Sequence, residues 1–197
     1  MNKKKIAVFM DRDGTINVEG GYINHEDRYE LLPNTAKAIK RLNDNKVLAI
    51  VCTNQAGVAR GYFKESLVKI VHAKLKSLLS EKGARVDDIF YCPHHPNLGG
   101  KYRKKCDCRK PGLGMIKKAE KKYNIDVKSS YVVGDKISDI VWGHRAGAKG
   151  VMVLTGYGSG EYKYQRRDWK DLPDFIAKDL NEAVKWILND IKKRPVS

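Results

Sequence analysis

Three aspartates follow short apolar runs of the chain. Asp11 and Asp13 come directly after the run 6–10, and Asp135 comes just after the run 131–133. If both runs are parallel strands, their carboxyl ends meet at one edge of a sheet, where open α/β sheets bind ligands. Three carboxylates at one point need a cation, because like charges at short range disfavour ionisation. Oxygen ligands with room for substrate are typical of Mg²⁺ sites, so these aspartates are candidate Mg²⁺ ligands.

Hydroxyl, amide and basic side chains could bind an anion beside that ion. Thr53 and Asn54 follow the apolar run 47–52, and Arg109 and Lys110 form a basic pair further along the chain. A threonine hydroxyl and a lysine ammonium can offset charge on an oxyanion that a metal ion bridges. The set therefore predicts a phosphate-bearing substrate.

Two plainer interpretations of Asp11 and Asp13 compete with this one. Asp-x-Asp-Gly segments are common in turns, so both residues could simply cap local structure. A calcium loop of the EF-hand type is excluded, because Ile16 stands where the loop needs glycine and Tyr22 where it needs glutamate. Residues 92–96, with two histidines, likewise follow the run 89–91, and polar residues at four strand ends favour a site over a turn.

A second candidate metal site combines cysteine and histidine. Cysteines 92, 106 and 108 are close in the sequence to His94 and His95, and either histidine could complete a tetrahedral zinc site. Four protein ligands leave no open position, so we expect zinc at 92–108 to be structural. The intervening segment 96–105 has little to bury, and a metal ion would order it.

Apolar and amphipathic segments alternate along the chain, which predicts a doubly wound parallel α/β sheet. Strands are expected at 6–10, 47–51, 89–91, 131–133 and 151–154, and helices at 35–43, 64–82, 115–123, 138–146 and 179–191. The segments 17–29 and 93–105 break the alternation, and long loops of this kind are often functional. No insertion is large enough for a separate cap domain, so one domain is expected over 1–197.

Composition limits the classes of protein further. The 197 residues are 42% hydrophobic and carry a formal charge of +16, which permits phosphate-bearing or nucleic-acid partners without requiring them. No apolar run is long enough for a membrane span or a signal peptide, so we expect a cytoplasmic protein with reduced thiols. No exposed apolar stripe stands out, and a monomer is expected.

The ordered motifs resemble those of the haloacid dehalogenase (HAD) phosphatase superfamily. The matching residues are Asp11-Arg12-Asp13-Gly14-Thr15, Thr53, Lys110 and Gly134-Asp135 with Asp139. Residues 53–55, 92–96, 106–111 and 134–136 further resemble D-glycero-D-manno-heptose 1,7-bisphosphate 7-phosphatases and the related histidinol-phosphate phosphatases. The resemblance implies a Mg²⁺-dependent phosphatase that removes the 7-phosphate through an aspartyl-phosphate. Its pathway would supply nucleotide-activated heptose for lipopolysaccharide or S-layer precursors.

The resemblance also implies a role for each matching residue. Asp11 would be the nucleophile, and Asp13 the general acid and then the general base. Both would hold Mg²⁺, Asp13 through its backbone carbonyl, with Asp135 as the third protein ligand. The zinc ligands would be Cys92, His94, Cys106 and Cys108, with His94 preferred to His95. The substrate contacts would be Glu19, Gly20, Gly21, Tyr22, Thr53, Asn54, Gln55, Arg109, Lys110 and Lys136.

Three other functions stay open at this point. The substrate could be histidinol phosphate, or the 3′-phosphate of a polynucleotide. The net charge of +16 favours the polynucleotide. Against the polynucleotide, the chain has no Gly-x-x-x-x-Gly-Lys-Ser/Thr loop and no aromatic–basic interleaving, so nucleic acid is not the expected partner. A zinc-dependent nucleic-acid-binding module without catalysis would leave the three aspartates unexplained. The sequence does not indicate which anomer of the sugar phosphate is used.

Overall fold

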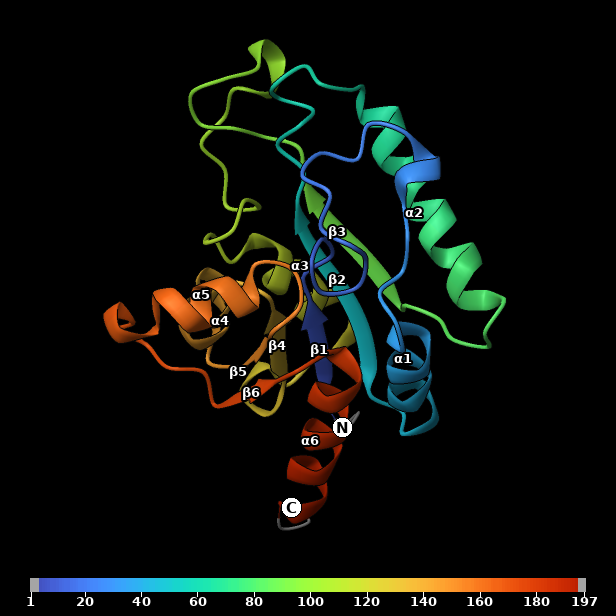
Figure 1. Cartoon of the computed structure of the whole chain (residues 1–197), viewed down its shortest axis with the longest axis vertical. Helices are drawn as coiled ribbons and strands as arrows, with labels where there is room; N and C mark the ends of the chain where they lie inside the picture. The colour runs from blue at the N-terminus through green and yellow to red at the C-terminus, as the bar shows by residue number, and fades with distance from the viewer. Residues whose placement is uncertain (1–3, 195–197) are drawn as a thin grey trace.

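The computed structural model describes residues 4–194, and its centre is one six-stranded parallel sheet (Figure 1). The strands are β1 (Ala7–Met10), β2 (Leu48–Asn54), β3 (Asp88–Cys92), β4 (Tyr131–Gly134), β5 (Lys149–Val153) and β6 (Phe175–Ala177). Their order in the sheet is β3-β2-β1-β4-β5-β6. The predicted doubly wound α/β fold is confirmed. Because the connections reverse direction between β1 and β4, these two neighbours define the point where such sheets bind ligands.

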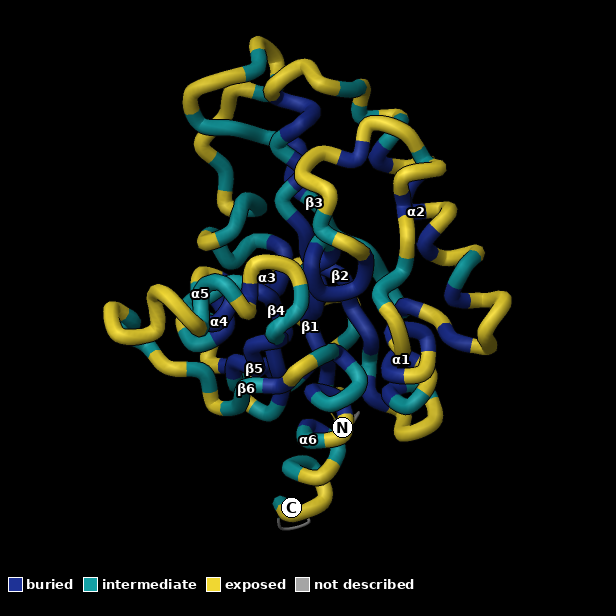
Figure 2. Tube along the Cα trace, viewed as in Figure 1, coloured by how far each residue is buried: buried dark blue, intermediate teal, exposed yellow. Residues whose placement is uncertain are grey.

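Helices cover both faces of the sheet. They are α1 (Thr35–Asp44), α2 (Glu65–Ser80), α3 (Gly114–Tyr123), α4 (Ile137–Ala146), α5 (Gly158–Tyr164) and α6 (Leu180–Lys193). Successive residues of β1 point to opposite faces: Val8 and Met10 pack in the core that α1, α2 and α6 share, and Ala7 and Phe9 pack in the core of α3 and α4. Figure 2 shows the strands buried between these layers. None of the described helices is long and apolar enough to cross a membrane.

The two segments that interrupt the alternation lie at the same end of the molecule. In Figure 1 the residues near 17–29 and 93–105 lie beyond the arrowheads of the strands, at the top of the view. Each holds one turn of 3-10 helix, at Glu26–Arg28 and Gly100–Tyr102. Both loops therefore border the end of the sheet where the candidate active site was expected.

His144 joins the end of α4 to the loop before β6. Its Nδ1 lies 2.7 Å from Asp171 Oδ1 and its Nε2 lies 2.8 Å from Asp174 Oδ2. Burial lowers the pKa of His144, but the hydrogen bonds to Asp174 and Asp171 outweigh it, so the pKa is raised above its ordinary value. Asp174 also accepts the backbone N–H of Gly150 at 2.7 Å, which ties this pairing to β5.

The replacement His144→Gln should therefore destabilise the protein more at pH 6 than at pH 9. When the pKa of a histidine is higher in the folded than in the unfolded state, its protonation stabilises the fold. This stabilisation is complete at pH values below the unfolded-state pKa, and it is lost as the pH rises through the folded-state pKa. We expect a loss of about 1 kcal/mol at pH 6, typical of partly exposed ion pairs. Urea unfolding at both pH values measures it. The control His25→Gln, at an exposed histidine, should change little, and equal losses for His144→Gln at both pH values would contradict the prediction.

Candidate active site

The predicted aspartates stand at the ends of the two central strands. Asp11 follows β1 directly, and its backbone N–H donates to Val133 O of β4 at 2.9 Å. Asp135 follows the last residue of β4 and is fully buried. Because β1 and β4 are adjacent and parallel, these two residues meet at the switch point of the sheet.

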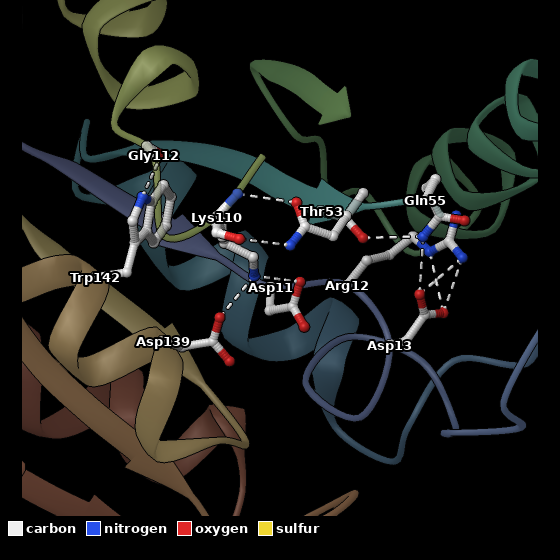
Figure 3. A network of polar contacts seen from close by, with 10 residues as sticks. Asp11, Arg12, Asp13, Thr53, Gln55, Lys110, Gly112, Asp139 and Trp142 are labelled. Carbon is white, nitrogen blue, oxygen red and sulfur yellow. Dashed lines mark hydrogen bonds and ion pairs between the residues drawn. The ribbon is translucent and has the colours of Figure 1, made fainter. Parts of the chain in front are cut away.

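Three carboxylates and one lysine form the centre of the site (Figure 3 shows Asp11, Asp139 and Lys110). Carboxylate oxygens of Asp11, Asp135 and Asp139 all lie within 4.8 Å of one another. Lys110 Nζ lies 2.8 Å from Asp11 Oδ1 and 2.6 Å from Asp139 Oδ1. Asp139 comes from the first turn of α4, so a helix adds a third carboxylate to the two from strand ends.

Burial strongly perturbs these groups. Burial raises the pKa of Asp11 to about 6, against the opposing effect of Lys110 and with a further increase from Asp139. Burial likewise raises the pKa of Asp135 to about 7. Burial would lower the pKa of Lys110, but Asp11 and Asp139 reverse that and raise it. Carboxylates that are costly to ionise together at neutral pH are what a divalent cation would stabilise.

One carboxylate oxygen of Asp135 has a hydrogen-bond partner, and the other has none in the described part of the chain. Its Oδ2 accepts the backbone N–H of Tyr157 at 2.9 Å, whereas its Oδ1 is buried with no hydrogen-bond partner among the described residues. Gly14 packs against this carboxylate: its φ is +81°, and a Cβ there would lie 2.2 Å from Asp135 Oδ2. Only glycine fits at this position, and the unpartnered Oδ1 is available as a metal ligand.

Lys110 is held from two sides. Its backbone N–H donates to Asn54 Oδ1 at 3.0 Å, and Asn54 Nδ2 donates back to Lys110 O at 3.2 Å. On the other side its ammonium lies 5.4 Å from the centre of the Trp142 ring, and Trp142 Nε1 donates to Gly112 O at 2.9 Å. Asn54, expected to contact substrate, thus also fixes the backbone that carries Lys110.

The carboxylate of Asp13 points elsewhere. It accepts hydrogen bonds from Arg12, Asn17 and Gln55, and Figure 3 shows it apart from Asp11 and Asp139. The three side chains that the structure gathers are therefore not those expected from sequence spacing, because Asp139 takes the place of the Asp13 carboxylate. Binding of Mg²⁺ through the Asp13 backbone carbonyl stays a prediction.

A cavity of about 650 Å³ opens onto these groups. The predicted residues that line it are Asp11, Asp13, Glu19, Gly21, Tyr22, Thr53, Asn54, Arg109, Lys110 and Lys136. Gly20 and Gln55 were predicted as contacts but do not line it; Gln55 instead donates to Asp13 and Thr53. Sequence reasoning did not propose Ala56, Pro111, Ser138, Asp139, Val141, Arg145 or Tyr157, which also line the cavity. Of these, Pro111 and Asp139 stood in the quoted motifs, Pro111 directly after Lys110 and Asp139 four residues after Asp135.

Residues 155–161, between β5 and β6, hold parts of the site in place through hydrogen bonds, a role that was not predicted. Thr155 Oγ1 donates to Gly14 O at 2.6 Å, and Tyr157 N–H donates to Asp135. Glu161 Oε2 accepts the backbone N–H of Ile137 at 2.7 Å, at the start of α4. The N-terminus of a helix carries a partial positive charge, so a nearby carboxylate is favourable there. Glu161 therefore stabilises α4, the helix that carries Asp139.

The predicted zinc ligands converge at the last residue of β3 and in the loop that follows it. Cys108 Sγ lies 3.1 Å from Cys92 Sγ and 3.0 Å from Cys106 Sγ, and His94 Nδ1 lies 3.4 Å from Cys108 Sγ. His95 points away, because its Nδ1 accepts the backbone N–H of Asn97. Three sulfur atoms and one imidazole nitrogen at these separations form a donor set suited to tetrahedral Zn²⁺.

The parallel sheet and its Asp-x-Asp strand end define the chain as a HAD-like phosphatase. The family model described as HAD-hydrolase-like matches residues 107–183. Two curated relatives are D-glycero-beta-D-manno-heptose-1,7-bisphosphate 7-phosphatases. The Haemophilus ducreyi protein is 45% identical over 158 residues, 79% of this chain and 86% of that protein. The Escherichia coli K12 protein is 37% identical over 191 residues, 93% of this chain and all of that protein.

A solved structure agrees with these relatives. The D,D-heptose 1,7-bisphosphate phosphatase of B. bronchiseptica, complexed with magnesium and phosphate, superposes with a TM-score of 0.82 at 30% identity, over 94% of this chain and 99% of that one. The chain belongs to the D-glycero-D-manno-heptose-1,7-bisphosphate 7-phosphatase family.

Proposed function

We propose that the protein removes the 7-phosphate of D-glycero-D-manno-heptose 1,7-bisphosphate through an aspartyl-phosphate on Asp11. The observation that carries this proposal is the Asp11 carboxylate, which faces the cavity beside Lys110, Asp135 and Asp139. The names of the curated relatives supply the substrate. The expected pathway is the synthesis of nucleotide-activated heptose.

We further propose that Asp11 and Asp135 bind the catalytic Mg²⁺, with the Asp13 backbone carbonyl. The unpartnered Asp135 Oδ1 and the close carboxylate oxygens support a hard divalent cation here. When bound, Mg²⁺ would supply positive charge to the phosphoryl oxygens. Asp139, paired with Lys110, would help to place that ligand set.

The side chains account for both halves of the reaction. Asp11 Oδ attacks phosphorus, the bond to the sugar oxygen breaks, and Asp13 as general acid gives a proton to the leaving alkoxide. Asp13 then takes a proton from the water that attacks the aspartyl-phosphate, which releases phosphate and restores Asp11. Thr53 Oγ1 already accepts a hydrogen bond from Gln55, so its O–H is free to donate to the phosphoryl group, next to the Lys110 ammonium.

Unpaired cations in the cavity favour a substrate with a second phosphate. Arg109, Lys136 and Arg145 line it, and none of them forms an ion pair with a described carboxylate. Ser138, Val141 and Arg145 share one face of α4, so Arg145 stands about 10 Å along the helix from Ser138. Helical side chains lean toward the N-terminus, which directs Arg145 back toward the reacting centre.

Replacing Arg145 with alanine should weaken binding of the bisphosphate without slowing the chemistry. We expect KM for heptose 1,7-bisphosphate to rise about tenfold while kcat stays within twofold, because the contact is made equally in ground and transition states. KM for heptose 7-phosphate, which lacks the second phosphate, should not change. Arg85→Ala, at an exposed arginine before β3, is the control. Equal increases in KM for both substrates would contradict a contact with the distal phosphate.

Turnover of a substrate panel tests the proposed function. The panel holds both anomers of heptose 1,7-bisphosphate, since curated relatives are named for either anomer, together with histidinol phosphate and 3′-phosphorylated DNA. We expect kcat/KM to be highest for one heptose anomer. A preference for histidinol phosphate or for the DNA would overturn the proposal.

We also propose that Cys92, His94, Cys106 and Cys108 bind a structural Zn²⁺. The convergence of their donor atoms supports this, and all four ligand positions are filled by protein. Thiolate ligands that stay reduced are consistent with the expected cytoplasmic location. We expect one domain over residues 1–197 that acts as a monomer.

A further inference from the structure

Arg12, between the two motif aspartates, has an unusual position. Its side chain is only 2% exposed, and its guanidinium pairs with the neighbouring Asp13. Nη2 lies 2.9 Å from Asp13 Oδ1 and 2.8 Å from Oδ2, and Nε lies 3.1 Å from Oδ1. A buried guanidinium requires partners for its other N–H groups as well.

His72, in the middle of α2, supplies one of these partners. Its Nε2 lies 3.3 Å from Arg12 Nη1, and the residue is 8% exposed. Arginine can only donate, so Nε2 must be the acceptor, and the imidazole is neutral with its proton on Nδ1. Burial and the Arg12 charge lower the pKa of His72 to about 3, in agreement with a neutral imidazole. The Tyr91 ring of β3 packs edge-on against the imidazole, with 5.4 Å between the centres of the two rings.

The remaining contacts of Asp13 complete a hydrogen-bond network around its carboxylate. Gln55 Nε2 donates to Asp13 Oδ2 at 3.0 Å, and Asn17 Nδ2 donates to Oδ1 at 3.0 Å. Arg12 is the only one of the three donors to Asp13 that is itself fixed from α2. Without the acceptor on His72, Arg12 Nη1 would be buried with an unmet hydrogen bond, and its guanidinium could move and take Asp13 with it.

We propose that His72 is a positioning residue for protonation of the leaving group: it orients Arg12, and Arg12 orients the Asp13 carboxyl. This inference rests on the proposed function, in which the phosphorus–oxygen bond to the sugar breaks and the alkoxide takes its proton from Asp13. Its consequence is specific. Loss of His72 should impair the step that needs a proton donor more than it impairs nucleophilic attack by Asp11.

Two substrates with different leaving groups separate these effects. A sugar alkoxide is a poor leaving group and needs the proton, whereas p-nitrophenolate leaves as a stable anion. The value of kcat/KM reports steps up to the first irreversible one, here phosphorylation of Asp11. We expect His72→Leu to lower kcat/KM for the sugar phosphate 10- to 100-fold and for p-nitrophenyl phosphate less than threefold. His72→Gln, whose Oε1 can accept from Arg12, should restore most of the activity on the sugar phosphate.

The outcomes distinguish the possible failures. Equal decreases on both substrates, with a lowered unfolding temperature, would show that His72 acts only in packing and would overturn the inference. The same holds if His72→Leu and His72→Gln behave alike on the sugar phosphate. If wild-type protein prefers another alkyl phosphate of the panel, the proposed substrate has failed, and the comparison with p-nitrophenyl phosphate is made on that ester.

Discussion

The variant Asp11→Asn should lose turnover by at least about 10⁴-fold while remaining folded. An amide cannot attack phosphorus in place of the carboxylate, so the covalent route is closed rather than weakened. In the structure this carboxylate is mostly shielded from solvent, which raises its pKa to about 6, and the neighbouring Asp139 adds to the increase. Lys110 keeps Asp139 as its partner in the variant. We therefore expect the metal-free variant to be at least as stable as wild type.

Steady-state turnover and thermal unfolding measure both parts of this prediction. Trapping with hydroxylamine should label Asp11 in wild-type protein during turnover, because an acyl-phosphate reacts with this nucleophile, and should label nothing in the variant. Asp44→Asn is the control, since Asp44 pairs with Lys40 on the surface of α1. Wild-type-like activity of Asp11→Asn would remove Asp11 as the nucleophile.

Loss of the predicted zinc should disable the enzyme although the zinc site takes no part in the chemistry. Arg109 and Lys110 follow Cys108 directly, so the candidate zinc ligands and the lysine proposed to bind phosphate share one segment of backbone. The loop before it packs few side chains, and residues 103–105 are all exposed. We expect about one zinc per chain in protein purified without chelator, and much less in Cys106→Ser.

In Cys106→Ser, kcat/KM should also fall about tenfold or more, and the segment 96–105 should become sensitive to proteolysis. Metal analysis, turnover and limited proteolysis report these three effects. Cys52→Ala is the matched control: Cys52 is fully buried in β2, outside the cluster, so its loss should lower stability and leave the zinc content unchanged. Wild-type protein without zinc would contradict the proposal.

Local sequence pattern predicted most of the fold. Continuous apolar runs revealed five of the six strands, because a strand buried on both faces needs no polar alternation. The sequence pattern missed β6, a strand of three residues at the edge of the sheet, and α5, whose segment Gly158–Tyr164 contains two glycines and no apolar stripe. Both elements form because their neighbours provide contacts, and such contacts leave little trace in local sequence.

The candidate site was predictable where strand ends decide position. Asp11, Thr53 and Asp135 come from neighbouring strands, so a parallel sheet alone brings them to one edge. The direction of the Asp13 carboxylate depends instead on Arg12 and on His72, sixty residues away. Likewise, Asp139 reaches the cluster only because α4 starts in a particular orientation. Long-range side-chain pairing of this kind is set by tertiary packing, which spacing along the chain does not encode.

The pairing of one lysine with two of three clustered aspartates has a consequence for the order of events. With all three carboxylates ionised, Asp11, Asp135 and Asp139 exceed the charge of Lys110 by two negative units. A phosphate dianion entering the empty cluster would be repelled, whereas one divalent ion would balance the excess. Ion entry should therefore precede ester entry, and inorganic phosphate should bind to the protein only when a divalent ion is present.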